Sequence, residues 1–171
     1  MILTTHAVFG AAVASLVPDH PIIGFTLGFA SHFVLDAIPH KDYELISIES
    51  DSKSKIQLIN ILQKKFSLLR DIIFVSLDAL VGFILAFLFF FNPAYPWIFF
   101  VGAFGSLIPD GMTFLYLIFK NKSLAAFYHF HSGYIHSRYI LKLNQFVGVI
   151  FQFVTVVVLI IIMYLIKAYT F

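Results

Sequence analysis

Gly24, Gly28, His32 and Asp36 follow one another at four-residue intervals in the apolar stretch from Gly24 to His40. Each such step advances an α-helix only about 40° beyond a full turn, so Gly28, His32 and Asp36 share one face. The glycines allow a neighbouring helix backbone to come close, and His32 and Asp36 project toward one point. An aspartate inside a membrane costs about 2.5–3.5 kcal/mol to insert. We therefore expect a metal ion or a buried polar network to offset this cost.

The composition identifies the class of protein. Hydrophobic residues make up 60% of the 171 residues and charged residues only 12%, with a mean hydropathy of +0.93. These values exclude an ordinary soluble domain and predict an all-α, multi-pass integral membrane protein with a single domain over residues 1–171. The first apolar run lacks a basic start, so we interpret it as retained. Because the chain has no cysteine, a metal ion would have to use histidine, carboxylate, backbone or water ligands.

Apolar segments of sufficient length predict about five transmembrane helices and one interfacial helix. Residues 41–55 are polar and predict a cytoplasmic loop, and residues 56–69 have the helical apolar spacing of an interfacial amphipathic helix. The predicted spans cover Ile2 to Val17, Pro21 to Ile38, Asp71 to Phe91, Trp97 to Phe119 and Phe146 to Ile166.

The fourth predicted span contains the triplet Pro109-Asp110-Gly111, where we expect the helix to break. Broken helices at membrane depth are tolerated where the released backbone lines protein or a polar cavity. This expectation places Asp110 beside such a cavity.

The basic residues predict the orientation. Ten of the eleven Lys and Arg residues lie in two connections, the one between the second and third spans and the one before the last span. By the positive-inside rule both connections, and the N-terminus, are cytoplasmic. The basic residues also indicate nearby anionic lipid headgroups, whereas no basic surface with interleaved aromatic residues points to nucleic acid.

This topology brings four potential ligands to similar depth. With a helix rise of about 1.5 Å per residue, His6, His32, Asp78 and Asp110 lie roughly 8 to 15 Å from the cytoplasmic ends of their spans. Three of the four helices carry small residues on the same face, as close packing around a shared site requires. In addition, three histidines fall within eight residues of the second connection, at His129, His131 and His136.

Each of these residues also has a purely structural interpretation. His32 and Asp36 could be a polar pair at a helix end, and Asp78 could hold two helices together by a hydrogen bond. Asp19 and His20 lie on the opposite side by the charge rule, and we interpret them as turn and cap residues. His40, after Pro39, is either an additional ligand or a hydrated residue.

The residue types nevertheless indicate a specific chemistry. Neutral imidazole and carboxylate ligands without thiolate suit zinc, or alternatively manganese, as one or two ions. Such ions lower the pKa of bound water, and Asp110 or Asp78 could then act as a general base. The depth of the site suits an ester or phosphoester of a membrane lipid. No nucleophile elbow, P-loop or dinucleotide fingerprint is present in the sequence.

Four short motifs resemble those of the bacterial inner-membrane metal-dependent hydrolase family, which is distantly similar to zinc-dependent phospholipase C. The motifs cover about 20 residues. They are Thr5-His6, Ser31-His32-Phe33-Val34-Leu35-Asp36, Leu107-Ile108-Pro109-Asp110 and His131-Ser132-Gly133-Tyr134-Ile135-His136-Ser137.

The resemblance implies a set of metal ligands and a location in the inner membrane. The implied ligands are His6, His32, Asp36, Asp110, His131 and His136. Ser132 and Ile135 stand where the family has Arg and Thr, so a phosphate contact from that Arg is not carried over. The Ser-His helix is also the second helix here, whereas it comes last in that family.

Together these observations predict a membrane-bound metal-dependent hydrolase that acts on a phosphoester or other ester, with a phospholipid as a candidate substrate. Two alternatives remain. A transport protein would use the same His and Asp residues along an ion path, and would then also use Asp19 and His20. A structural or partner-binding protein would use them only to hold helices together.

Overall fold

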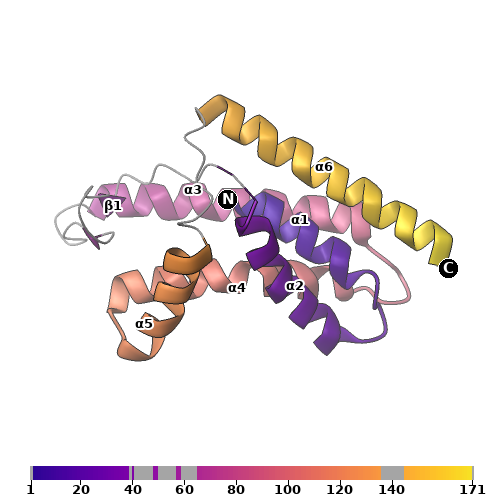
Figure 1. The fold of residues 1–171 in the computed structure, drawn as a ribbon, viewed down its shortest axis with the longest axis horizontal. Helices are drawn as coiled ribbons and strands as arrows, with labels where there is room; N and C mark the ends of the chain where they lie inside the picture. Colours follow the sequence, from indigo (N-terminus) through magenta and orange to yellow (C-terminus); the bar gives the residue numbers. More distant parts are fainter. Residues whose placement is uncertain are drawn as a thin grey trace.

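The computed structural model describes residues 2–38, 40, 48–49, 57–58, 65–135 and 145–170, and these ranges are almost entirely helical (Figure 1). One two-residue antiparallel pair accompanies the helices, with Ile48 opposite Leu58. The predicted all-α class is confirmed. In chain order the elements are α1 (Leu3–Ala14), α2 (Pro21–Asp36), β1 (Ile48–Glu49), β2 (Gln57–Leu58), α3 (Lys65–Phe90), α4 (Ile98–Phe119), α5 (Lys122–Tyr128), the π-helix η1 (His129–Ile135) and α6 (Gln145–Thr170).

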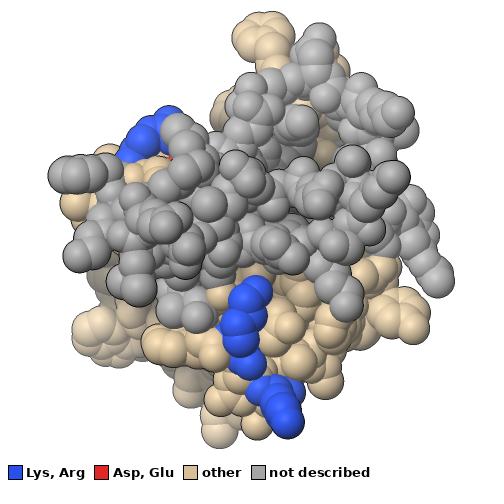
Figure 2. Space-filling model, turned by 90° about the vertical axis from the view of Figure 1, so that its left-hand side faces the viewer, with Lys and Arg blue, Asp and Glu red and all other residues tan. Residues whose placement is uncertain are grey.

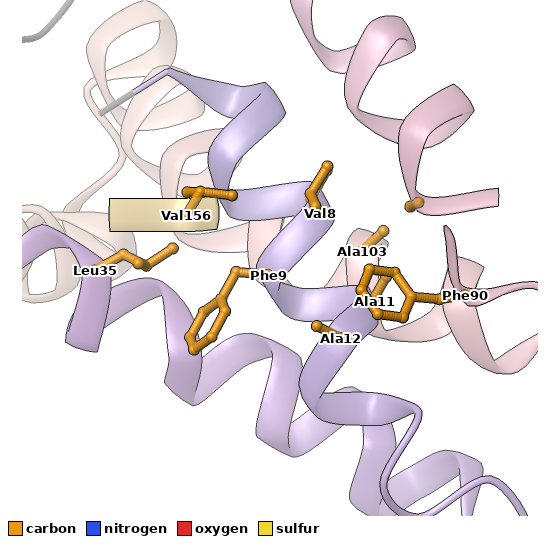
Figure 3. Packing of buried hydrophobic residues seen from close by; sticks show 10 residues of the cluster. Val8, Phe9, Ala11, Ala12, Leu35, Phe90, Ala103 and Val156 are labelled. Atoms are coloured by element: carbon orange, nitrogen blue, oxygen red, sulfur yellow. The ribbon is translucent and has the colours of Figure 1, made fainter. Parts of the chain in front are cut away.

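Helix α1 lies at the centre of the fold. It carries no charged residue, and nearly all of its side chains are buried, as expected for a helix that is apolar on every side. Its alanines and glycine let α2, α3, α4 and α6 pack around it. Figure 3 shows the resulting core, in which Val8 and Phe9 of α1 lie among Leu35 of α2, Phe90 of α3 and Val156 of α6.

Within the described ranges, three helices are long and apolar enough to cross a membrane, at Ser67–Phe90, Ile98–Leu117 and Phe146–Ile166. Their outward faces expose large hydrophobic side chains such as Leu88 and Phe153, which is typical of surfaces that contact lipid. Helices α1 and α2 have 12 and 16 residues, or about 18 and 24 Å. Both are shorter than a hydrocarbon core of about 30 Å. The structure therefore indicates a membrane protein, and the count of five spans stays a prediction.

The predicted break at Pro109-Asp110-Gly111 is wrong, because α4 continues through Pro109 from Ile98 to Phe119. A proline removes only one backbone donor, the N–H that would bond the carbonyl four residues earlier. Packing against α1 and α2 holds α4 together on both sides of that position. Asp110 consequently presents its side chain from a continuous helix.

The structure also differs from the prediction of an interfacial helix over residues 56–69. Gln57–Leu58 pairs with Ile48–Glu49 as a short ladder, and α3 already begins at Lys65. Apolar helical spacing continues from residue 65 into the third span, so the two segments form one helix. The remaining residues of 56–64, and most of the predicted loop 41–55, lie outside the described residues.

Glycines bring α1, α2 and α4 into close contact at one crossing. A Cβ atom on Gly28 would collide with the backbone of Gly102, and a Cβ atom on Gly10 would collide with both Gly102 and Ser106. The close helix approach predicted from the glycine stripe of α2 is therefore present. As a consequence, His6, His32 and Asp110 are held near one another, because they lie one turn from Gly10, Gly28 and Ser106, respectively.

Basic side chains gather at one end of the molecule. The first turns of α3 and the end of α4 point to the same end in Figure 1, where α5 also lies. Arg70, Lys120 and Lys122 are exposed there, and Figure 2 shows Lys and Arg side chains on this face.

Candidate metal centre

Imidazole and carboxylate groups from four elements meet in one cluster. Helix α1 contributes His6, α2 contributes His32 and Asp36, α4 contributes Asp110 and η1 contributes His131. Among the residues that the structure describes, two groups of three side chains gather potential ligand atoms for metal binding, namely His6 with His32 and Asp110, and His32 with Asp36 and His131. In each group the potential ligand atoms lie within 4.8 Å of one another.

The tightest part of the cluster is a triangle of three polar atoms. His32 Nε2 and His131 Nε2 each lie 2.9 Å from Asp36 Oδ2, and the two nitrogens are 2.9 Å apart. A single proton can bridge only one of these three contacts, whereas one cation can contact all three atoms. Ligands about 2.0–2.1 Å from a tetrahedral zinc ion are about 3.3 Å apart. The triangle is therefore close to the size that a bound ion requires.

Hydrogen bonds at the far side of each ring orient the two imidazoles. His32 Nδ1 donates to the carbonyl of Ser106 over 2.8 Å, so in the neutral ring Nε2 carries a lone pair toward the cluster. Thr113 Oγ1 lies 2.9 Å from His131 Nδ1. Ser106 Oγ in turn donates to the carbonyl of His6 over 2.8 Å, which ties α4 to α1 at this level. Outer partners of this kind are typical of histidine metal ligands.

The other oxygen of Asp36 faces a second pair of imidazoles. Asp36 Oδ1 lies 3.2 Å from His6 Nε2 and 3.9 Å from His40 Nε2. His40 is 4% exposed, and its Nδ1 donates to the carbonyl of Ile38 over 2.7 Å, which directs Nε2 toward Asp36. The structure thus adds His40 to the cluster, a residue whose role the sequence left open.

Asp110 lies at the accessible side of the cluster. Its Oδ1 is 3.7 Å from His32 Nε2 and 3.9 Å from His131 Nε2. The side chain of Asp110 is 32% exposed, whereas those of His32, Asp36 and His131 are at most 2% exposed. Among the described members of the cluster, Asp110 is therefore the one that water or a substrate meets first.

The cluster fits a divalent ion by a second criterion. His6 is fully buried. Its Nε2 lies 3.2 Å from Asp36 Oδ1, yet within the described part of the chain neither ring nitrogen makes a hydrogen bond of good geometry. A buried polar atom without such a bond costs about 1–3 kcal/mol. A metal ion coordinated by His6 would remove this cost at the nitrogen that binds it, and the nitrogen and oxygen donors present are those that zinc and manganese accept.

Asp78 has a different set of partners from the one predicted for a catalytic residue. Its carboxylate accepts hydrogen bonds from Thr4 N over 3.0 Å and from Thr4 Oγ1 over 2.6 Å. Thr4 lies in the first turn of α1, where backbone N–H groups lack partners within the helix. Asp78 thereby connects α3 to the start of α1, and it belongs to neither group of potential metal ligands.

The remaining predicted residues are placed as follows. His136 lies outside the described residues. His129 is exposed on η1 and packs against Tyr116 and Tyr128. Asp19 and His20 lie in the exposed turn between α1 and α2, with their side chains 3.5 Å apart.

Comparisons with protein-family models, with curated proteins and with solved structures give no match. The resemblance inferred from short motifs stays a prediction.

Proposed function

We propose that the protein is a membrane-bound, metal-dependent hydrolase whose centre is the cluster of His32, Asp36, His131 and Asp110. The observation that carries this proposal is the triangle of three buried ligand atoms, each 2.9 Å from the other two. These atoms come from two elements far apart in the sequence, and each histidine is oriented by a separate hydrogen bond. A cluster that only held helices together would not need three potential acceptors to face one another.

The ion would be zinc, with manganese as the alternative, and His32 Nε2, His131 Nε2 and Asp36 Oδ2 would hold it. When bound, it supplies Lewis-acid chemistry, polarising the oxygen of an ester and making water a nucleophile near neutral pH. The aspartate is a hard oxygen ligand and the histidines are borderline, a combination that suits both metals.

Asp110 is the proposed general base. Its carboxylate lies at the exposed side of the cluster, within 4 Å of two ligand nitrogens. In this position it can accept the proton of a water molecule whose oxygen attacks the ester, while the bond to the leaving oxygen breaks. A carboxylate buried like Asp36 could not exchange that proton with solvent as readily.

Aromatic side chains beside the centre support a lipid ester as substrate. Phe33 and Phe127 lie 5.8 Å and 6.0 Å from the ring of His131, measured between ring centroids. Phe130, which is 46% exposed, packs against Phe33 at 5.6 Å. An apolar wall next to a hydrolytic centre would accept the acyl part of a membrane lipid. The exposed basic residues Arg70, Lys120 and Lys122 support placing this end of the molecule at anionic headgroups on the cytoplasmic side.

The test is hydrolysis of phospholipid and of a soluble phosphodiester reporter by the purified protein in detergent. We expect turnover that a chelator abolishes and that zinc or manganese restores. Asp110→Asn should lower kcat at least 100-fold while leaving the protein folded. His20→Ala, a change at an exposed histidine outside the cluster, is the matched control and should keep full activity. A metal-loaded, folded protein that hydrolyses neither ester would refute the hydrolase proposal.

A further inference from the structure

The rings of His6 and His32 are stacked. Their centroids are 4.1 Å apart and the angle between their planes is 21°. His6 comes from α1 and His32 from α2, and the glycine crossing of these helices with α4 sets their spacing.

Stacked imidazoles cannot share one metal ion without distortion. The lone pair of an imidazole nitrogen lies in the plane of the ring, so a coordinated ion lies close to that plane. With planes nearly parallel and up to 4.1 Å apart, an ion about 2.0–2.1 Å from one nitrogen remains far outside the plane of the other ring. Two ions, one in each plane, would be separated by about the spacing of the rings. Two-metal hydrolytic sites have separations of about 3.5–4 Å.

The two oxygens of the Asp36 carboxylate face different imidazoles. Oδ2 lies 2.9 Å from Nε2 of both His32 and His131, whereas Oδ1 lies 3.2 Å from Nε2 of His6 and 3.9 Å from Nε2 of His40. Such a carboxylate can bridge two ions, giving one oxygen to each. A centre with a single ion would use only Oδ2 and would leave the arrangement around Oδ1 without a function.

Asp110 and His40 are the further potential ligands for an ion beside His6. Asp110 has an oxygen within 4.8 Å of ligand atoms of both His6 and His32, so it can reach an ion at either ring. His40 is nearly buried and directs Nε2 toward Asp36. His6 Nε2 is buried and lies 3.2 Å from Asp36 Oδ1, but it makes no hydrogen bond of good geometry within the described chain, as expected of a ligand position.

We propose that the centre is dinuclear, with a second divalent ion in the plane of the His6 ring, held by His6 and Asp36 Oδ1. His40 and one oxygen of Asp110 are its further ligands, and the other oxygen of Asp110 remains the proposed general base. Asp36 then bridges the two ions. This proposal rests on the proposed metal-dependent function and adds the number of ions and their separate ligand sets.

The experiment uses Mn²⁺ alone as the probe. Purified protein is stripped of metal, titrated with Mn²⁺, and measured for metal content per chain and by electron paramagnetic resonance, because two ions bridged by a carboxylate are exchange-coupled. We expect two ions per chain and a coupled spectrum in the wild type. His6→Phe, which keeps a flat ring against His32 but removes the nitrogens, should hold one ion with an uncoupled spectrum. His129→Phe, at an exposed histidine on η1, is the control and should keep two.

The outcomes separate this proposal from the preceding one. One ion per wild-type chain, with an uncoupled spectrum, would overturn the dinuclear centre and leave the metal-dependent function standing. A wild type that binds no Mn²⁺ and no zinc would overturn both. Should His6→Phe fail to fold, His40→Ala tests the same claim at a different ligand, and we expect it to weaken binding of the second ion at least 10-fold while the first ion stays bound.

Discussion

Asp36 is the residue on which the proposed centre depends, because its two oxygens lie within 4 Å of four different imidazoles. A carboxylate that is fully buried is costly unless cations or hydrogen-bond donors surround it. Here the surrounding groups are imidazoles, which are common metal ligands. The buried charge and the histidines are therefore best explained together, as one site.

Asp78 connects α3 to the start of α1, because its carboxylate accepts hydrogen bonds from Thr4 N and Thr4 Oγ1. We expect Asp78→Ala to lower the free energy of unfolding in detergent by about 1–3 kcal/mol, because the partly buried N–H of Thr4 loses its acceptor, whereas Thr4 Oγ1 can still donate to the carbonyl of residue 78. Metal content per chain should not change. Thermal unfolding and metal analysis together check this, with the exposed Asp19→Ala as control. Loss of metal in a folded Asp78→Ala protein would restore Asp78 to the site.

Thr113 orients His131 through a contact of 2.9 Å with Nδ1. Thr113→Val keeps the shape of the side chain but removes its hydroxyl, and we expect it to weaken metal binding about 10- to 100-fold. Thr26→Val is the matched control, since the Thr26 hydroxyl bonds only the carbonyl of Ile22 on the exposed face of α2. Competition with a chelator of known affinity measures the change. Equal affinity in both variants would show that Thr113 does not orient the ligand.

The sequence could indicate His32 and Asp36 as one unit, because four-residue spacing places them on one face whatever the rest of the chain does. The sequence could not show that Asp110 faces the cluster and that Asp78 does not. Helix rise gives the depth of a residue along its axis, but not the direction in which its face is turned within the bundle. Ser106 and Thr113 gave no signal either, since a carbonyl or a hydroxyl becomes a partner of a histidine only after the helices have packed.

At the scale of helices, the crossing of α1, α2 and α4 positions the ligands. Gly28→Ala would place a Cβ atom against the backbone of Gly102, and overpacking of this kind costs about 1–3 kcal/mol. We expect α2 and α4 to move apart, with lower thermal stability and weaker metal binding. Gly111→Ala is the matched control, because nothing lies within 4 Å of its Cβ position. Identical metal binding by the two variants would contradict the role of the crossing.

Element boundaries were predictable where a single pattern dominates. The last span was predicted over Phe146 to Ile166, as the structure has it, because an uninterrupted apolar run permits no other start or end. The break predicted at Pro109 is wrong, because the sequence shows that the proline lacks an N–H but does not show the neighbouring helices that keep α4 continuous. Residues 57–58 were expected in a helix for a similar reason, because their ladder partners, residues 48–49, lie elsewhere in the chain.

For the whole molecule, the charge asymmetry predicts which end faces the cytoplasm. The chain has no cysteine, so single cysteines can be introduced and labelled with a maleimide that does not cross membranes. In intact cells we expect Ser123→Cys, near Lys122 on α5, to be protected and Ala94→Cys, in the turn between α3 and α4, to be labelled. The reverse pattern would place the metal centre at the opposite face.

The central claim is that His32, Asp36 and His131 bind a metal ion, and metal analysis of the purified protein tests it most directly. Protein prepared without chelators should contain zinc or manganese in stoichiometric amount. Asp36→Asn should lose most of it, because the amide cannot supply the charged oxygen between the histidines, while His20→Ala should retain it. A folded wild-type protein that contains no metal and takes up none on addition of zinc or manganese would contradict the account.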